Sequence, residues 1–360
     1  MTTSVYIIAT GARTPLGVRS APSAAAYRAG ISGMGEHPFM IDQVGDPMPG
    51  ALDVELDPGL MGPERLLALL ETALREACAP LGRDPQTLHL RLPLYLGLPE
   101  IRPGFTEQDA TAVRAGLTRF EELPITISEV SVFTQGHAAG LAALAMATEK
   151  IQQGAFETCL VGGVESYFEP NTMEWLDENR QLAGAVSRSG FVPGEGAGFC
   201  LLMTERARTR LGLSALARVL EVATGKETML IKTADICLGA GLTEVVHRTV
   251  GSLSPGSGKV NAVICDINGE RYRGEEWGFV CLRLSQYFDD PTAYDSPADC
   301  WGDMGAASGP LFIMLACQAI ARGYAKGPRA LLWTSSEGGL RGAAVIETLG
   351  KNMRAEDGHA

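Results

Sequence analysis

Gln135-Gly136-His137-Ala138-Ala139-Gly140 and, shortly after it, Thr158-Cys159-Leu160-Val161-Gly162-Gly163-Val164-Glu165 are the stretches that decide the fold. They predict a small-residue turn, a buried helix over 138–153 and a strand over 157–162. A side chain at a helix N-terminus lies where an anion is stabilised, so residue 137 stands where a nucleophile is expected. Cys or Ser there would predict covalent acyl transfer. With His137 the scaffold is present without the usual nucleophile.

The pattern occurs a second time, 169 residues later in the chain. His137-Ala138-Ala139-Gly140 corresponds to Ala306-Ala307-Ser308-Gly309, and the same shift carries the strand-like run 92–97 onto 261–266. A shift that places helix on helix and strand on strand predicts two similar halves. We expect these halves at 1–208 and 209–349, followed by a flexible polar tail at 350–360.

Strands alternate with helices along both halves, which predicts an α/β fold. In the first half, strands are expected near 4–9, 92–97, 125–130, 157–162 and 197–204, and helices near 63–79, 106–118 and 138–153. Elements of the second half are expected near 214–223, 240–252, 260–266, 275–286, 306–322, 329–334 and 342–347. The long polar segment 166–190 is predicted as an irregular loop or cap near the site.

Composition excludes several classes of function. The chain has 360 residues, 46% hydrophobic and 20% charged, with a formal net charge of −12 and no basic run. These features argue against nucleic acid or an anionic membrane as a partner. No apolar stretch approaches the roughly 20 residues that span a bilayer. The eight cysteines are scattered without a CxxC pair, so we expect reduced, buried thiols in a cytoplasmic protein, with no metal site and no cofactor.

Two motifs resemble those of a known family. Gly162-Gly163-Val164-Glu165-Ser166 is followed by Arg188-Ser189-Gly190-Phe191-Val192-Pro193-Gly194-Glu195-Gly196-Ala197-Gly198. The pair is similar to the GG-x-E and D-G-F-V-x-G-E-G-A-G motifs of the β-ketoacyl synthases of the thiolase superfamily. The resemblance implies a duplicated thiolase-type fold with five layers, α-β-α-β-α, and the helices 138–153 and 306–322 in the middle. It also implies a homodimer, or a heterodimer with a related synthase subunit, through the strand near 125–130.

The catalytic residues of that family do not carry over. Counting along the motifs puts its nucleophilic Cys at His137 and its first catalytic His at Asn268. Its second His falls on Gly302 in an ungapped comparison and on Asp303 with a one-residue deletion. The Phe that gates the family's pocket is replaced by Glu337.

Several polar residues are expected to face His137. They give the candidate active-site positions Asn268, Asp303, Glu270 and Glu337, with Asp266, Arg271 and Arg273 nearby. One interpretation is that His137 is a polar plug within a satisfied ion-pair network. The other is a re-purposed site in which His137 is a general base or nucleophile assisted by a carboxylate. Cys265 and Cys300 lie close to the lost positions but alternate with apolar residues, so we expect neither to be a nucleophile.

The residues favour a degenerate, non-condensing β-ketoacyl synthase-like protein over an enzyme. It would bind an acyl-carrier protein, an acyl thioester or a partner synthase subunit, as the similar chain-length-determining subunits of polyketide systems imply. The alternative is an active acyltransferase or thioester hydrolase that uses His137. We also predict that Glu337 pairs with Arg341 or protonated His137, which would leave a narrow polar cavity closed to a long acyl chain.

Overall fold

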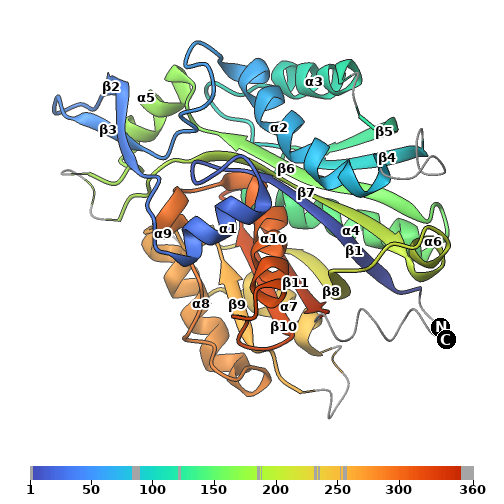
Figure 1. Ribbon diagram of the computed structural model, residues 1–360. Coiled ribbons are helices and arrows are strands. Elements are labelled where there is room, and N and C mark those ends of the chain that lie inside the picture. Colours follow the sequence, from blue (N-terminus) through green and yellow to red (C-terminus); the bar gives the residue numbers. More distant parts are fainter. Residues whose placement is uncertain are drawn as a thin grey trace.

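Nine strands form one continuous sheet that folds around two central helices in the computed structural model (Figure 1). The structure describes residues 3–82, 90–120, 123–184, 187, 189–230, 233, 236–251, 253 and 258–349. The predicted flexible tail at 350–360 and Arg188 of the second motif lie outside these residues. The strand order is β5-β4-β6-β7-β1-β8-β11-β10-β9.

The first five strands of that order belong to the N-terminal half. They are β5 (Ile125–Phe133), β4 (Leu90–Gly97), β6 (Thr158–Ser166), β7 (Glu195–Thr204) and β1 (Val5–Arg13). Helices α2 (Gly62–Cys78) and α3 (Glu107–Gly116) cover their outer face. The apolar side of α2, with Leu66, Leu69, Leu70 and Leu74, packs with β4 and β7 into one buried cluster. Such a one-sided apolar stripe is what fixes a helix to a sheet.

The C-terminal half repeats this arrangement with one strand fewer among the described residues. Its strands are β8 (Ala217–Lys226), β11 (Leu340–Thr348), β10 (Arg329–Ser335) and β9 (Ala262–Cys265). Helices α7 (Ala240–Gly251) and α8 (Arg271–Leu284) cover its outer face. Strand β1 pairs with β8 from Val5↔Val219 to Ile7↔Ala217, so these two strands join the halves.

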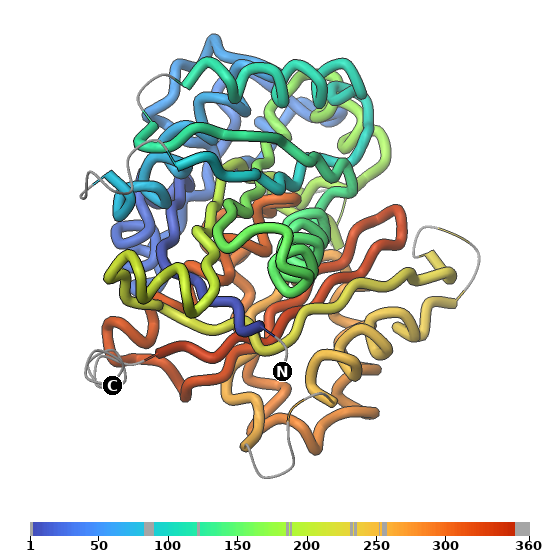
Figure 2. Tube along the Cα trace, turned by 90° about the vertical axis from the view of Figure 1, so that its right-hand side faces the viewer, coloured from blue at the N-terminus to red at the C-terminus, as the bar shows by residue number. Residues whose placement is uncertain are grey.

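Two apolar helices fill the middle layer. These are α4 (Ala139–Gln152) and α10 (Ser308–Ala321), each preceded by a 3-10 turn, at Gly136–Ala138 and Gly305–Ala307. The bounds of each pair differ by the 169 residues expected from the sequence (139 and 308, 152 and 321). Figure 2 shows α4 almost end-on, between the two parts of the sheet. The five-layered thiolase-type fold predicted from the sequence is therefore confirmed.

Close backbone contacts explain some of the glycines in this core. A Cβ on Gly163 of β6 would lie 2.1 Å from the backbone oxygen of Ala306, at the turn before α10. A Cβ on Gly140 of α4 would lie 2.6 Å from Pro310 Cδ in α10. Only glycine lets these elements approach so closely.

The structure departs from the sequence prediction in the connections. The segment 166–190, predicted as an irregular loop, contains the helix α5 (Pro170–Glu178), which Pro170 begins and the Glu169 side chain caps. Further elements that were not predicted are α1 (Ser20–Arg28), the hairpin β2 (Gly35–Ile41) and β3 (Pro47–Gly50), α6 (Glu205–Arg210), α9 (Ala298–Trp301) and the 3-10 turns Ala79–Gly82, Leu117–Arg119 and Ser285–Tyr287.

All eight cysteines are free. Cys237, Cys281 and Cys300 are half-buried rather than buried as predicted, and the other five are buried. Within the described part of the chain, no helix combines the length and the apolar character needed to cross a membrane.

Candidate functional site

His137 lies at the point where β5 turns into the central helix α4. The turn requires φ of +65° at Gly136, a left-handed conformation that favours glycine. The following 3-10 turn places the His137 side chain in the interior, where the residue is only 7% exposed. The predicted strand, turn and helix around residue 137 are therefore present.

Asp303 is held opposite His137 by the glycine-rich motif. Its backbone N–H donates to Val192 O (2.7 Å), and its carbonyl accepts from Gly194 N–H (2.9 Å). Gly302 precedes it with φ of +74°, and a Cβ there would lie 2.9 Å from Val192 O. Of the two residues that the sequence left open for the family's second His, Asp303 is the one whose side chain contacts His137.

The Asp303 carboxylate accepts four hydrogen bonds. Oδ2 accepts from His137 Nε2 (2.9 Å) and Asn268 Nδ2 (2.5 Å). Oδ1 accepts from the Tyr167 hydroxyl (3.0 Å) and the Gly305 N–H (2.7 Å). Burial alone would raise the pKa of this carboxyl, but His137, Arg273 and Asn268 hold it well below its usual range. Asp303 is therefore a buried anion whose acceptor capacity is filled by the protein.

Arg273 on α8 completes the network beneath His137. Its guanidinium is fully buried and donates to Asp266 Oδ2 (2.7 Å), Glu270 Oε2 (3.2 Å) and Ser335 O (2.7 Å). It also lies 3.1 Å from His137 Nε2. One ring nitrogen cannot donate and accept at once, so we assign the Nε2 proton to the shorter, oppositely charged contact with Asp303.

The ionisation of His137 follows from these neighbours. Burial and the Arg273 guanidinium oppose a charge on the imidazole, yet Asp303 and Asp266 outweigh them and raise the pKa of His137. The shift in His137 and the opposite shift in Asp303 agree that the pair is ionised.

Backbone N–H groups at the starts of the central helices are also occupied. Ala138 N–H donates to Ser336 Oγ (2.9 Å), and the Ser336 hydroxyl in turn donates to Gln135 O. Ala306 N–H donates to Glu165 Oε2 (3.3 Å), while Gly305 N–H is bound by Asp303. These amides would be the natural donors to the oxygen of a bound thioester. In this protein they are bound by its own side chains.

A cavity of about 240 Å³ opens beside His137 and is called the His137 cavity here. Its polar wall includes Glu337, Glu100 and the Arg102–Glu165 ion pair, in which Nη2 and Oε1 are 2.6 Å apart. Burial raises the pKa of Glu100, and the nearby Glu337 adds to this. Its apolar wall is formed by Tyr167, Trp175, Leu176 and Phe191. The cavity is therefore small and partly acidic.

The predicted partner of Glu337 was wrong with respect to Arg341. Arg341 instead forms a buried pair with Glu276, with Nη2 2.5 Å from Oε1 and Nε 2.9 Å from Oε2. Glu337 is half-buried at the rim of the His137 cavity and accepts a long hydrogen bond from Gln181 Nε2 (3.5 Å). Strand β11 turns the Arg341 side chain toward α8, which the spacing of residues 337 and 341 does not reveal.

The remaining predicted site residues divide clearly. His137, Asn268, Asp303 and Glu270 meet in one network, as expected, through Arg273. Arg271 does not join it, because its side chain is 79% exposed and pairs with Glu275 on the surface (2.6 Å). Residues that sequence reasoning missed are Tyr167, Ser336, Arg102 and Glu165. For Glu165 the GG-x-E motif was a usable signal.

Glu195 of the second motif has a structural role. It forms a two-pronged ion pair with Arg65, both contacts 2.6 Å long, and accepts from Asp53 N–H (2.8 Å) and Ser166 Oγ (2.9 Å). Fully buried and saturated in this way, it fixes the loop that positions Asp303.

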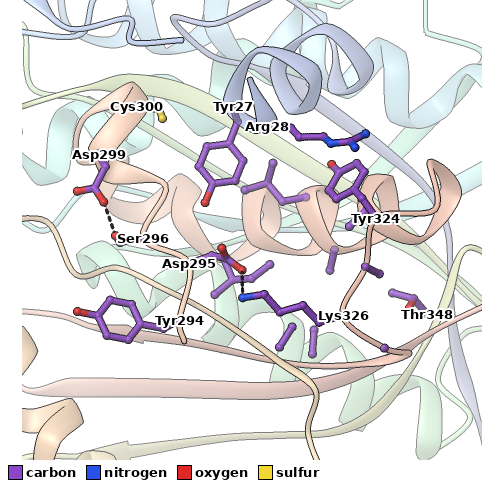
Figure 3. Close-up of a pocket in the computed structure, with 18 of the residues that line it drawn as sticks. Tyr27, Arg28, Tyr294, Asp295, Ser296, Asp299, Cys300, Tyr324, Lys326 and Thr348 are labelled. Atoms are coloured by element: carbon purple, nitrogen blue, oxygen red, sulfur yellow. Dashed lines mark hydrogen bonds and ion pairs between the residues drawn. The ribbon is translucent and has the colours of Figure 1, made fainter. Parts of the chain in front are cut away.

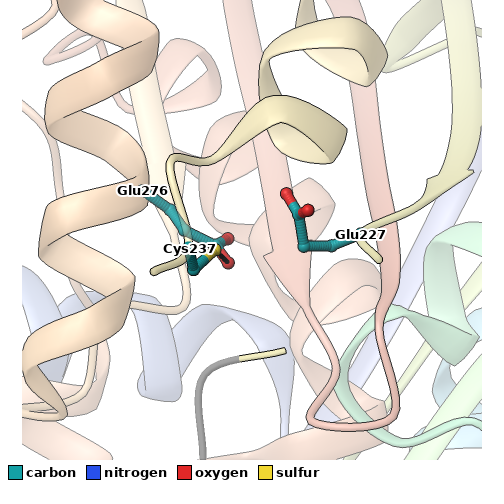
Figure 4. Close-up of side chains that lie close together, drawn as sticks. All are labelled: Glu227, Cys237 and Glu276. Carbon is teal, nitrogen blue, oxygen red and sulfur yellow. Dashed lines mark hydrogen bonds between the residues drawn. The ribbon is translucent and has the colours of Figure 1, made fainter. Parts of the chain in front are cut away.

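Glu227, Cys237 and Glu276 form a separate cluster whose potential ligand atoms lie within 4.8 Å of one another (Figure 4). Glu276 is already neutralised by Arg341, and Glu227 accepts from Gly241 N–H (2.7 Å) and from Thr228 N–H (3.0 Å). Burial raises the pKa of Cys237 to about 11, so its thiol stays protonated. A cation needs a thiolate and free carboxylate oxygens, so this cluster does not fit a metal site.

Comparisons with known proteins agree with this fold. Residues 129–208 match the family model described as "Beta-ketoacyl synthase, N-terminal domain". No curated protein matches the sequence. Among solved structures, the ishigamide ketosynthase/chain length factor has a TM-score of 0.79 at 16% identity, covering 97% of this chain and 100% of that one.

Two further structures are similar. One is a type II PKS acyl-carrier protein in complex with its ketosynthase bound to the hexaketide, with a TM-score of 0.77, 16% identity and coverage of 97% and 100%. The other is the ketosynthase from module 6 of the bacillaene synthase of Bacillus subtilis 168, with a TM-score of 0.76, 14% identity and coverage of 96% and 72%. The chain is therefore a β-ketoacyl synthase-like protein with the thiolase-type fold of the ketosynthases.

Proposed function

We propose that the protein is a non-condensing, ketosynthase-like subunit that acts by binding an acyl-carrier protein, an acyl group or a partner synthase subunit. The observation that carries this proposal is the Asp303 carboxylate. It lies at the centre of the residues that replace the family's catalytic groups and receives hydrogen bonds from His137 and Asn268. A site built to stabilise a substrate anion would leave such donors free.

The chemistry of condensation makes the same point. A thiolate must carry the acyl chain, and His donors must stabilise the enolate formed on decarboxylation. His137 would give a hydrolytically labile acyl-imidazole, and its Nε2 is bound to Asp303. Losing one oxyanion donor costs about 2.7–4 kcal/mol of barrier. Here the position also holds a fixed negative charge, which repels a developing oxyanion.

The partners follow from the fold and its relatives. Strand β5 is an edge strand, so one side of its backbone is open to pairing with a second copy or a related subunit. The similar structures include a ketosynthase/chain length factor and a ketosynthase with an acyl-carrier protein, which supports the choice of these two partner classes. We place the protein in the cytoplasm, in keeping with its free cysteines.

The proposal is tested by separating binding from turnover. Purified protein is incubated with acyl- and malonyl-loaded acyl-carrier proteins and with a ketosynthase encoded beside it, followed by native mass spectrometry and product analysis. We expect a complex with a carrier protein or synthase and no condensed product. A condensed β-ketoacyl product formed by this chain alone would contradict the proposal. So would failure to bind either partner class.

The second candidate function is an acyltransferase or thioester hydrolase. It is favoured by the 2.9 Å contact between His137 and Asp303, because an imidazole oriented by a carboxylate is the arrangement of a general base. With Nε2 bound to Asp303, Nδ1 would have to activate a water in the His137 cavity. Hydrolysis of a short acyl thioester that His137→Ala abolishes would establish this function and replace the first proposal.

A further inference from the structure

A second cavity, of about 460 Å³, lies between α1, the C-terminal half of α10 and strands β9 and β10 (Figure 3). It shares no lining residue with the His137 cavity and is called the α1/α10 cavity here. Its floor consists of small aliphatic side chains, namely Ala262, Ile264, Ala316, Ala319 and Ala330. This volume lies in the range of small-molecule sites, which runs from roughly 300 to 1,000 Å³.

The duplicated fold shows where the space comes from. The offset of 169 residues places Ile264 of β9 where β4 has Tyr95, and both side chains face the central helices. In the N-terminal half, Tyr95 is buried and its ring lies 6.0 Å from that of Phe156. This aromatic pair fills the space that the smaller Ile264 leaves open. The C-terminal half therefore lacks the aromatic filling of its counterpart.

Charges around the α1/α10 cavity are balanced. Lys326 Nζ lies 3.5 Å from Asp295 Oδ2, and the Arg28 guanidinium stacks 4.2 Å from the centre of the Tyr324 ring. Asp299 accepts a hydrogen bond from the Ser296 hydroxyl (2.6 Å). Two cationic and two anionic side chains thus line the same space. A ligand with a net charge of either sign would meet like charge there, so the lining favours a neutral molecule.

The polar groups left for a ligand are hydrogen-bond donors. The Tyr27 ring points from α1 into the cavity, toward Asp295 and Lys326 (Figure 3). Burial raises the pKa of its hydroxyl, which stays protonated, and it makes no hydrogen bond with the described residues. Lys326 donates to Ala293 O (2.9 Å), and an ammonium group has three donors. A ligand would therefore present an acceptor to these groups and a flat apolar body to the alanine floor.

We propose that the α1/α10 cavity binds a neutral aromatic molecule that carries a carbonyl group. Its ring system lies on Ala316 and Ala319 of α10, between the tyrosines at the rim. Its carbonyl oxygen accepts from Tyr27 and Lys326. Aromatic walls with a few convergent polar groups are the usual composition of such sites.

The test is calorimetric titration with acetylnaphthalene, with naphthoate and naphthylmethylammonium as charged probes of the same ring system. We expect saturable micromolar binding of the ketone and binding at least tenfold weaker for both ions. Tyr27→Phe should weaken ketone binding about fivefold to tenfold, as expected for one lost hydrogen bond. Tyr287→Phe is the matched control, because Tyr287 lies outside the cavity, and should leave binding unchanged.

A second variant fills the space itself. Ala319→Phe should abolish binding while circular dichroism shows a folded protein. Absence of saturable binding of the ketone by the wild-type protein would overturn the proposal. Tighter binding of either ion would also overturn it, as would ketone binding that Tyr27→Phe leaves unchanged.

Discussion

Replacing Asp303 by Asn removes one negative charge from the buried network and keeps the shape of the side chain. The remaining amide oxygen can still accept from Tyr167 and Gly305. The new NH2 group, however, faces the Asn268 amide and His137 Nε2, which both donate to the carboxylate in the wild-type protein. His137 can adapt by losing its proton. Asn268 cannot flip without cost, because its Oδ1 accepts from Glu270 N–H (3.0 Å).

The expected loss follows from these contacts. Two charge-assisted hydrogen bonds contribute about 1.5–3 kcal/mol each, of which one is partly replaced by a neutral bond to His137. Breaking a buried pair typically costs about 3–5 kcal/mol, and we expect Asp303→Asn to fall in that range. The matched control is Asp295→Asn, whose half-exposed carboxylate lies 3.5 Å from Lys326 Nζ. Such a surface pair contributes about 0–1 kcal/mol.

The assay is urea unfolding at neutral pH, followed by tryptophan fluorescence and far-ultraviolet circular dichroism. Coincident transitions are required before a single free energy is derived. We expect Asp303→Asn to lower the free energy of unfolding by at least 2 kcal/mol more than Asp295→Asn, on the order of the difference between buried and exposed pairs. Equal effects of the two variants would refute the view that the Asp303 network stabilises the fold.

Stability should depend on pH through His137, because its folded pKa is raised: its contribution is complete below about pH 6.5 and is lost as pH rises through the folded pKa. Urea unfolding should therefore show wild type exceeding His137→Gln by more at pH 6 than at pH 9, roughly one pKa unit being 1.4 kcal/mol; a constant difference would contradict this. Gly163→Ala should destabilise strongly, by about 3 kcal/mol or more, because the new Cβ would lie 2.1 Å from Ala306 O. In the same assay Gly274→Ala, in helix α8 with open space around it, should stabilise by about 0.5–1 kcal/mol, and the opposite order would refute the packing argument.

Local pattern and internal duplication were enough to predict the fold. Periodicity located α4 and α10, and the offset between them holds to the residue because both helices fill equivalent places in one core. The Pro170 helix was missed, because its polar composition outweighed its N-terminal proline and cap. Hairpin β2–β3 lies on the surface, and its apolar residues, such as Phe39, are largely exposed. Core-based reasoning has no signal for such a segment.

The candidate site was predicted in part. Counting along motifs placed His137, Asn268 and Asp303 together, since each follows a strand or precedes a helix of the core. Charge partners could not be assigned in this way. Arg271 and Arg273 are two residues apart on one helix, so they point to different sides, and only the second reaches the interior. Arg341 finds Glu276 through tertiary packing alone.

The most direct test of the central claim is a single-turnover reaction of the protein with an acyl thioester and malonyl-loaded acyl-carrier protein, followed by intact-protein mass spectrometry. If Asp303 fills the site as described, no acyl adduct forms on His137 and no β-ketoacyl product is released. A stable acyl adduct on the wild-type protein that disappears in His137→Ala, together with a condensed product, would contradict the account.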